Sequence, residues 1–444
     1  MQKSRVLVVG LGKTGLSIAR HLSREKTPFI LFDTRKAPAG LAELQTLFPD
    51  TVVYLEHFPA EELQHVSLVI TSPGVPLETE VLQKAREFNI PIIGDIECFA
   101  RVVRAPVIAI TGTNGKSTVT TLVGEMAKAA GFSVAVAGNI GTPVLDRLDD
   151  GIAYDLWVLE LSSFQLDLIE SLTPIAATIL NVTPDHLDRH HTMAAYCAAK
   201  QRVYLHAQIS VYNRDDQQTV PKQITGHSYG LDAPPSALDW GLCQNNQGHY
   251  YLCQGEDLVF PVASLLLKGR HNWLNALAAC ALAACANIPV TAMTAVLATF
   301  TGLPHRCQWV RALEDVVWIN DSKGTNVGAT LSAILGIGRS IEGKIVLIAG
   351  GQGKGADFTA LQDVVQTFVR SVILIGEDAD KLDVALHQST KIQHADSLEA
   401  AVRLARAVAE PGDVVLLSPA CASFDMFRDF NHRGEAFTQA VVTL

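Results

Sequence analysis

The sequence predicts an α/β protein with three domains, each built on a largely parallel sheet. Short apolar runs rich in Val, Ile and Leu alternate with helical patterns along the chain, which is typical of parallel sheets joined by helices. Glycine-containing turns follow several of these runs, and such turns present helix N-termini to anions. The chain has 444 residues, more than one ordinary core accommodates. We place the domains at residues 1–94, 95–302 and 303–444.

The first segment, residues 1–94, is predicted to be a Rossmann-like domain. Its expected strands are RVLVVG, PFILFD, SLVITSPG and IPIIG, separated by helical patterns. The turn GLGKTG at residues 10–15 matches the GxGxxG pattern, and Asp33 ends the next expected strand, about where a ribose-binding acid lies in dinucleotide sites. This pattern alone is a weak indication of NAD binding, so an NAD-dependent oxidoreductase is one alternative.

The other two segments are also predicted to be α/β. Residues 208–262 of the second segment are polar and rich in turns, which indicates irregular β structure. The third segment is expected to be Rossmann-like again, with strands at KIVLIAGG, SVILIGE and DVVLLSPA. The strands expected in the second segment lie near residues 107–111, 156–161 and 176–181.

Composition argues against two classes of partner. The formal net charge of -10 disfavours sequence-independent nucleic-acid binding, which depends on an excess of Lys and Arg. We expect no signal peptide, because MQKSRVLVVG has only a short apolar run before the first glycine, and residues 276–286 are too few to span a bilayer. The 8 cysteines contain no CxxC pair and are expected to be reduced thiols. We therefore expect a cytoplasmic protein that binds neither nucleic acid nor membranes.

The stretch VIAITGTNGKST, residues 107–118, is predicted to bind phosphate. A buried strand, a glycine turn and a helix follow one another, which is the context of a P-loop. Backbone N–H groups would hold phosphate oxygens, Lys116 would reach the terminal phosphates, and Ser117 could bind Mg²⁺. The loop is a variant with Gly112 and Gly115, because isoleucine replaces the first glycine of the consensus. The alternative is an ordinary βα turn with a surface lysine.

The variant loop TGTNGKST resembles the nucleotide loop of the Mur ligase family, whose relatives include folylpolyglutamate synthetase. The resemblance extends over essentially the whole chain, through LELSSFQL at 159–166, NVTPDHLDRH at 181–190, HNWLNALAA at 271–279, GLPHR at 302–306 and NDSKGTN at 320–326. It implies an N-terminal Rossmann-like domain, a central P-loop-type ATPase domain and a C-terminal Rossmann-like domain. It also implies an ATP-dependent ligase that forms an amide through an acyl phosphate. The implied ATP contacts are Gly112, Thr113, Asn114, Gly115, Lys116, Ser117, Thr118, Asn272, Asn275, Arg306 and Asp321.

The resemblance further implies two Mg²⁺ ions. Glu160 and His186 each follow an expected strand, where side chains face the crevice at the sheet edge. Lys200 lies on an apolar helical stripe with Met193, Tyr196, Val203 and Ala207. From the pattern alone, we favour a lysine that extends its ammonium group to solvent. The resemblance instead implies a Lys200 carbamate, formed from CO₂, as an oxygen ligand. The implied metal set is Ser117, Glu160, His186 and Lys200, and the implied catalytic set is Lys116, His186, Lys200, Arg306 and Lys323.

By the same resemblance, the first domain binds the UDP part of UDP-N-acetylmuramoyl-L-alanine and the third binds D-glutamate. SPACASFDMF is similar to the family members that add D-glutamate, and no DNPR-like stretch, common in members that add a diamino acid, is found. The UDP-substrate contacts would be Lys13, Thr14, Asp33, Thr34, Arg35, Ser72, Gly74, Asn139, Ser162 and Gln165. The D-glutamate contacts would be Thr325, Lys354, Ser423 and Phe430. We expect a monomer.

Three alternatives remain open at the level of sequence. A folylpolyglutamate-synthetase-like ligase shares the central chemistry and differs in its acceptor. An oxidoreductase would bind NAD at the turn of residues 10–15. A non-catalytic regulator would bind ATP without turnover.

Overall fold

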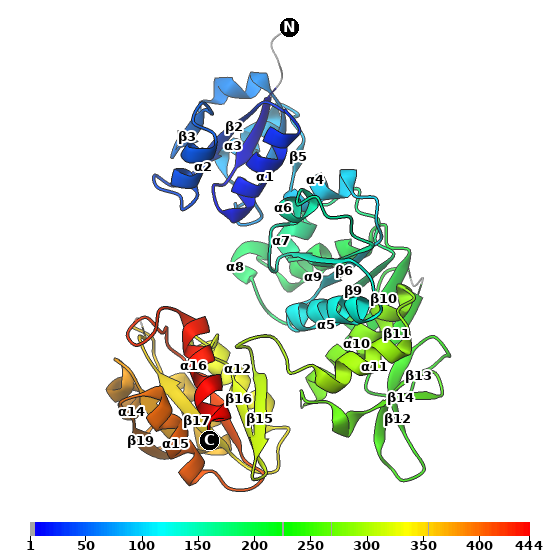
Figure 1. The fold of residues 1–444 in the computed structure, drawn as a ribbon. Helices are drawn as coiled ribbons and strands as arrows, with labels where there is room; N and C mark the ends of the chain where they lie inside the picture. The colour runs from blue at the N-terminus through cyan, green and yellow to red at the C-terminus, as the bar shows by residue number, and fades with distance from the viewer. Residues whose placement is uncertain (1–4, 224–225, 268, 354) are drawn as a thin grey trace. The chain divides into compact units, whose positions relative to one another are not determined.

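The computed structural model describes residues 5–223, 226–267, 269–353 and 355–444, which contain three sheets with flanking helices (Figure 1). The elements of the first sheet region are β1 (Arg5–Val9), α1 (Lys13–Arg24), β2 (Phe29–Asp33), α2 (Leu41–Leu47), β3 (Val53–Leu55), the 3₁₀ helix η1 (Ala60–His65), β4 (Val66–Thr71), α3 (Glu80–Glu87) and β5 (Ile92–Ile93). The strand order is β3-β2-β1-β4-β5, and all pairs are parallel. Winding reverses between β1 and β4, where ligands bind in sheets of this type.

Among the described residues, the second sheet has nine strands, and the glycine turn follows the third strand from one edge. The elements are α4 (Asp95–Val102), β6 (Val107–Thr111), α5 (Lys116–Ala129), β7 (Val134–Gly138), α6 (Val144–Leu148), β8 (Leu156–Glu160), α7 (Ser163–Leu166), β9 (Ala176–Ile179), α8 (Leu187–His190), α9 (Met193–Gln201), η2 (Arg202–Tyr204), β10 (Ile209–Asn213), η3 (Gln217–Thr219), β11 (Gly226–Tyr229), β12 (Trp240–Gln244), β13 (Tyr250–Gln254) and β14 (Asp257–Pro261). The order is β14-β13-β12-β11-β10-β9-β6-β8-β7, with antiparallel pairing at β12, β13 and β14. The strand before the turn, β6, lies between two parallel neighbours, β8 and β9.

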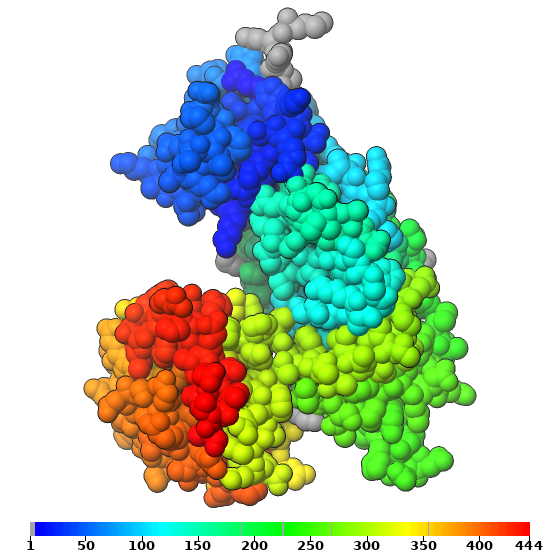
Figure 2. Space-filling view, viewed as in Figure 1, coloured from blue at the N-terminus to red at the C-terminus, as the bar shows by residue number. Residues whose placement is uncertain are grey.

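The third sheet follows η4 (Val262–Ser264) and the helices α10 (Arg270–Cys285) and α11 (Val290–Thr299). Its elements are β15 (Gln308–Leu313), β16 (Val316–Asn320), α12 (Val327–Gly338), β17 (Ile345–Gly350), η5 (Thr359–Leu361), α13 (Gln362–Phe368), β18 (Val369–Ile375), α14 (Ala379–Leu386), β19 (Lys391–His394), α15 (Leu398–Val408), β20 (Val414–Leu417) and α16 (Phe430–Val442). The order is β15-β16-β20-β17-β18-β19, and β15 pairs antiparallel. Figure 2 shows α16, in red, on the surface of this part.

Central strands such as β1, β6 and β17 are buried on both faces, as parallel sheets require. In the third sheet, Leu347 of β17 belongs to a cluster with Leu361 and Leu374, while its neighbour Ile348 packs with Trp318 on the opposite face. The chain divides into two compact units, residues 1–261 with 274–296, and residues 262–273 with 297–444. Alternation of apolar strands and helices therefore predicted the α/β class correctly.

Two details differ from the sequence expectations. The described residues between 208 and 262 are largely β structure as expected, but β12, β13 and β14 form a regular antiparallel meander rather than irregular strands. The expectation that all cysteines are reduced thiols is wrong for Cys243 and Cys253, which form a disulfide between β12 and β13. Among the described helices, none is both long enough and apolar enough to cross a bilayer.

Candidate active site

The glycine turn after β6 has the backbone of a phosphate-binding loop. Gly112 and Gly115 have φ angles of 154° and 82°, and α5 begins directly after Gly115. A Cβ atom on Gly115 would also collide with Oδ1 of Asn275 on α10, so the position requires glycine for two reasons. Because Gly115 has no side chain to cap the helix, the first N–H groups of α5 are available to an anion in front of the loop.

The loop is held in shape by the segment that leaves β9. The N–H of Thr113 donates to the carbonyl of Asn181 at 2.9 Å. The Asn181 side chain accepts from the N–H of Asn114 at 2.8 Å and donates to the carbonyl of Asn114 at 3.0 Å. The Thr113 hydroxyl accepts from the N–H of Thr183 at 3.0 Å and hydrogen-bonds to the Tyr196 hydroxyl at 3.2 Å. The three side chains or backbone groups that hold the loop, from Asn181, Thr183 and Tyr196, were assigned no such role from the sequence.

Glu160, at the end of β8, lies beside the start of α5. Its side chain is 2% exposed. Its Oε2 accepts from the Ser117 hydroxyl at 2.7 Å, and its Oε1 accepts from the Asn139 amide at 2.8 Å. Both donors are neutral groups, so neither of these two hydrogen bonds brings a positive charge to the buried carboxyl group. A carboxylate and a hydroxyl in contact are the hard oxygen ligands that suit Mg²⁺.

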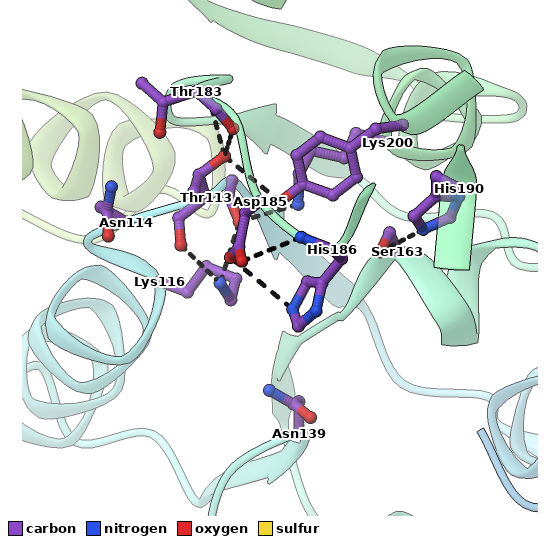
Figure 3. A network of polar contacts seen from close by, with 12 residues as sticks. Thr113, Asn114, Lys116, Asn139, Ser163, Thr183, Asp185, His186, His190 and Lys200 are labelled. Carbon is purple, nitrogen blue, oxygen red and sulfur yellow. Dashed lines mark hydrogen bonds and ion pairs between the residues drawn. The ribbon is translucent and has the colours of Figure 1, made fainter. Parts of the chain in front are cut away.

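Two lysines converge on one carbonyl of the loop (Figure 3). Nζ of Lys116 donates to the carbonyls of Gly112 and Thr113, both at 2.9 Å. Nζ of Lys200 donates to the Gly112 carbonyl at 2.8 Å and lies 4.5 Å from the centre of the Tyr196 ring. Lys200 is 1% exposed, and burial, together with the positive charge of Lys116, lowers its pKa to about 7. The prediction made from the helical pattern alone, an ammonium group extended to solvent, is wrong, because Nζ of Lys200 is buried against the loop.

His186 lies opposite the loop but is open to solvent. Its backbone is left-handed, with φ 51°, and its side chain is 48% exposed. Its Nε2 is 3.6 Å from Oδ2 of Asp185. Glu160 and His186 follow β8 and β9, which lie on either side of β6, so their strands are not direct neighbours. No cluster of three His, Cys, Asp or Glu side chains suited to a metal occurs in the part of the chain that the structure describes, and the four-residue metal set stays a prediction.

A cluster around Phe164 of α7 was not predicted. The His190 ring stacks on Phe164 with centroids 5.5 Å apart, and its Nε2 hydrogen-bonds to the Ser163 hydroxyl at 2.9 Å. The Arg189 guanidinium lies 5.0 Å from the centre of the Phe164 ring and donates to the carbonyl of Val75 at 2.8 Å. These side chains lie in the stretches LELSSFQL and NVTPDHLDRH. The aromatic residue of the first stretch and the basic residues of the second were the features from which this cluster could have been predicted.

A cavity of about 420 Å³ opens at the switch point of the first sheet. Both oxygens of Asp33 are occupied there: Oδ2 accepts from the N–H of Leu11 at 2.6 Å and from Arg35 at 2.7 Å, and Oδ1 accepts twice from Arg35. Burial alone would raise the pKa of Asp33, but these hydrogen bonds lower it. A carboxylate satisfied in this way is poorly suited to bind ribose hydroxyls, whether of NAD or of UDP, so it favours neither nucleotide. Seven predicted residues line the cavity: Lys13, Thr14, Asp33, Thr34, Arg35, Ser72 and Gly74.

A second cavity, of about 330 Å³, lies at the carboxyl ends of β16, β17 and β20. Thr325, Ser423 and Phe430 line it, as predicted, while Lys354 lies outside the described residues. Nζ of Lys323 is 4.8 Å from the centre of the Phe430 ring. Buried Arg433 donates to the carbonyls of residues 322, 421 and 422, and so fixes the segment that carries Ser423.

The remaining predicted nucleotide contacts differ in accessibility. Asp321 is 7% exposed and accepts from the Ser418 hydroxyl at 2.7 Å and from the N–H of Cys307 at 3.1 Å. Burial raises the pKa of Asp321 to about 6. Arg306 is exposed, and Asn272 and Asn275 lie three residues apart in the first turns of α10.

Comparisons with known proteins agree along the chain. Residues 4–94 match the Mur ligase MurD-like N-terminal domain, residues 110–283 the Mur ligase middle domain, and residues 305–421 the Mur ligase glutamate ligase domain. The UDP-N-acetylmuramoylalanine--D-glutamate ligase of Legionella pneumophila (strain Paris) is 64% identical over 99% of each chain. The enzyme of that name from Coxiella burnetii (strain Dugway 5J108-111) is 47% identical, over 100% of this chain and 99% of its own.

A solved structure is similar in fold. The UDP-N-acetylmuramate-alanine ligase from Thermotoga maritima has a TM-score of 0.56 at 17% identity, over 99% of each chain. The match of three family models in their order along the chain also confirms the expectation of three domains. Identity of 64% over nearly the full length, together with these models, makes this chain a member of the Mur ligase family.

Proposed function

We propose that this protein uses ATP to join D-glutamate to UDP-N-acetylmuramoyl-L-alanine, a step of peptidoglycan precursor synthesis. The observation that carries the proposal is the phosphate loop, with Lys116 and Ser117 at the start of α5 and buried Glu160 hydrogen-bonded to Ser117. Full-length relatives named for this ligation support the choice of substrates. The cavities at the first and third sheets support separate sites for the UDP group and the amino acid.

The reaction requires activation of a carboxylate, because a carboxylate is a poor electrophile. A carboxylate oxygen of the muramoyl-alanine substrate attacks the γ-phosphorus of ATP, the bond to the β-phosphate oxygen breaks, and ADP leaves. The amine of D-glutamate attacks the acyl carbon of the resulting acyl phosphate and loses a proton. The tetrahedral intermediate then collapses, the carbon–oxygen bond to phosphate breaks, and the amide forms. Positioning and charge stabilisation provide most of the acceleration in such transfers.

The loop residues have distinct tasks in the first step. The N–H groups at the start of α5 bind phosphate oxygens, and Lys116 exchanges its contacts with the carbonyls of Gly112 and Thr113 for oxygens of the terminal phosphate. Arg306 and Lys323 are assigned to the transferred phosphate by the family resemblance. Their exposure in this structure leaves both side chains accessible to a ligand.

Ser117 and Glu160 fit a Mg²⁺ site. The two hydrogen-bond donors to the buried Glu160 carboxyl group are neutral, so a cation could bind there and balance its charge. When bound, Mg²⁺ supplies charge neutralisation at the phosphate oxygens. Glu160 holds the orientation of the Ser117 hydroxyl, and Asn139 holds that of Glu160. His186 and a Lys200 carbamate complete the protein ligands in our proposal.

Lys200 is proposed to act as a carbamate. A neutral amine forms a nitrogen–carbon bond with CO₂ and releases a proton, and the product is an anion with two hard oxygens. The buried position of Lys200 and its pKa of about 7 support this reaction, because the neutral form is abundant near neutral pH. The product would place a negative charge beside Lys116, which is cationic.

Phosphate release provides the test. Phosphate should appear when ATP, Mg²⁺, UDP-N-acetylmuramoyl-L-alanine and D-glutamate are present together, and omission of any one should abolish it. Turnover with a pteroate acceptor in place of the UDP substrate would support the folylpolyglutamate-synthetase-like alternative. Tight binding of NADH in a fluorescence titration, without phosphate release, would support the oxidoreductase.

A further inference from the structure

The cavity at the third sheet, of about 330 Å³, contains a negative charge at the place proposed for a dicarboxylate. Among the described residues that line it, Asp429 is the only charged side chain. The polar groups of Thr325, Asn326 and Ser423, which also line the cavity, are neutral. D-glutamate carries two carboxylates and one ammonium group at neutral pH. An acidic side chain in its cavity repels the carboxylates and attracts the ammonium group.

The Asp429 carboxylate is held in place at the start of α16. Its Oδ1 accepts a hydrogen bond from the N–H of His432 at 2.8 Å, which makes Asp429 the N-cap of this helix. The same hydrogen bond lowers the pKa of Asp429, so the group is ionised at neutral pH. An ionised carboxylate has about four acceptor positions. The capping bond therefore leaves acceptor capacity for a ligand in the cavity.

A second helix begins at this cavity with a neutral cap. The side chain of Asn326 accepts from the N–H of Ala329 at 2.9 Å and is the N-cap of α12. No acidic residue lies in the first turn of α12, so the positive end of its dipole is not balanced by a nearby carboxylate of that turn. At α16 the Asp429 carboxylate provides such a balance. The two helix starts therefore favour ligand groups of opposite charge.

We propose that Asp429 binds the ammonium group of D-glutamate and thereby places the nucleophilic nitrogen, while the carboxylates contact the hydroxyls of Thr325 and Ser423. The inference rests on the proposed function, because the cavity is assigned to the amino acid there. The contact also provides selectivity. A dicarboxylate without an amine loses the attraction to Asp429 and keeps the repulsion.

The change Asp429→Asn separates this role from helix capping. Asparagine caps helices about as well as aspartate, so the hydrogen bond from His432 is kept while the charge is removed. Asp425 offers a matched control in the same segment, and it is not among the described residues that line the cavity. Its Oδ2 accepts from the N–H of Glu377 at 2.9 Å, and asparagine keeps an acceptor for that group. Asp425→Asn thus removes an equal charge outside the cavity.

The first measurement is the KM of each substrate. Asp429→Asn should raise KM for D-glutamate by about tenfold, because a charge-assisted hydrogen bond to the substrate is lost. The kcat value and the KM values of ATP and of the UDP substrate should stay within about twofold of wild type, since the contact is made equally in the ground state and the transition state. Asp425→Asn should leave all four values near those of wild type.

Inhibition by glutarate distinguishes recognition of the amine from a change in the shape of the cavity. Glutarate has both carboxylates of D-glutamate but no amine. It should therefore inhibit Asp429→Asn at least about threefold more strongly than wild type, because the repulsion by Asp429 is removed. A distorted cavity would instead weaken the binding of glutarate and D-glutamate together. Should Asp429→Asn fold poorly, Asp429→Ser also caps the helix without a charge and should give the same pattern.

Two results would overturn the proposal. One is a KM for D-glutamate in Asp429→Asn within about twofold of wild type, and the other is glutarate inhibition that does not strengthen. A rise in KM for D-glutamate of the same size in Asp425→Asn would also contradict it, because the effect would then come from net charge. Wild-type protein without phosphate release would refute the proposed function. Active wild-type protein with an unaffected Asp429→Asn variant would refute only the role of Asp429.

Discussion

Lys200 offers the sharpest test of the proposed chemistry, because its charge changes sign between the two forms. A lysine with the ordinary pKa of 10.5 is neutral in about one molecule in three thousand at pH 7, whereas a pKa of about 7 makes about half neutral. Burial against the loop therefore raises the fraction able to add CO₂ by about a thousandfold. Because the neutral amine is the reactive form, carbamate occupancy should increase as the pH rises through about 7.

The direct assay is a ¹³C NMR spectrum of the protein in ¹³C-labelled bicarbonate. We expect a carbamate signal that grows from pH 6 to pH 8 and is absent in Lys200→Ala. Lys128 is a suitable control, since it is exposed and its Nζ is 2.8 Å from Oε1 of Glu125, and Lys128→Ala should retain the signal. Lys200→Ala should also lose at least about 100-fold in phosphate release, and acetate should partly restore it.

Rescue by a short amine instead of acetate would show that Lys200 acts as a cation. A wild-type spectrum without the carbamate signal at pH 8, in enzyme that is fully active after CO₂ is removed, would refute the reasoning.

Three further predictions follow from the phosphate loop and the cavities. Lys116→Ala should reduce phosphate release at least about 1000-fold while the melting temperature stays within a few degrees, and near wild-type release would exclude the loop as the ATP site. Glu160→Gln keeps the shape that Ser117 and Asn139 contact but removes the charge, so half-maximal activity should need about tenfold more Mg²⁺; an unchanged Mg²⁺ titration would contradict this. D-glutamate should be preferred to L-glutamate and diaminopimelate. Turnover measured over a panel of amino acids tests this preference, and equal turnover with a diamino acid would contradict it.

Much of the fold was predictable because parallel sheets leave a strong signal in sequence. Runs such as those that became β6, β17 and β20 are apolar without interruption, since both faces of the sheet are covered. The strands β7 and β15 are only partly buried and were not predicted: β7 consists of small residues (VAVAG), and β15 mixes apolar with polar residues. The disulfide of Cys243 and Cys253 was missed because it depends on the register of two paired strands, which spacing alone does not reveal.

The candidate site was predictable where residues next to one another in the sequence form the turn and carry the functional groups. Gly115, Lys116 and Ser117 are of this kind, and the structure brings them together with Glu160. Supporting contacts were not predictable, because they join distant segments through side-chain orientation. Asn181 and Phe164 are examples.

The bonds between Asn181 and the loop have a consequence for how nucleotide binding relates to folding. The loop takes its shape from a side chain that is 67 positions further along the chain, so β6 with α5 is not a binding unit by itself. Competence to bind ATP should arise late in folding, once β9 has paired with β6. Nucleotide added during refolding would then stabilise the completed sheet and leave earlier intermediates unaffected. ATP binding would thus report, and stabilise, only those molecules in which the middle sheet is assembled.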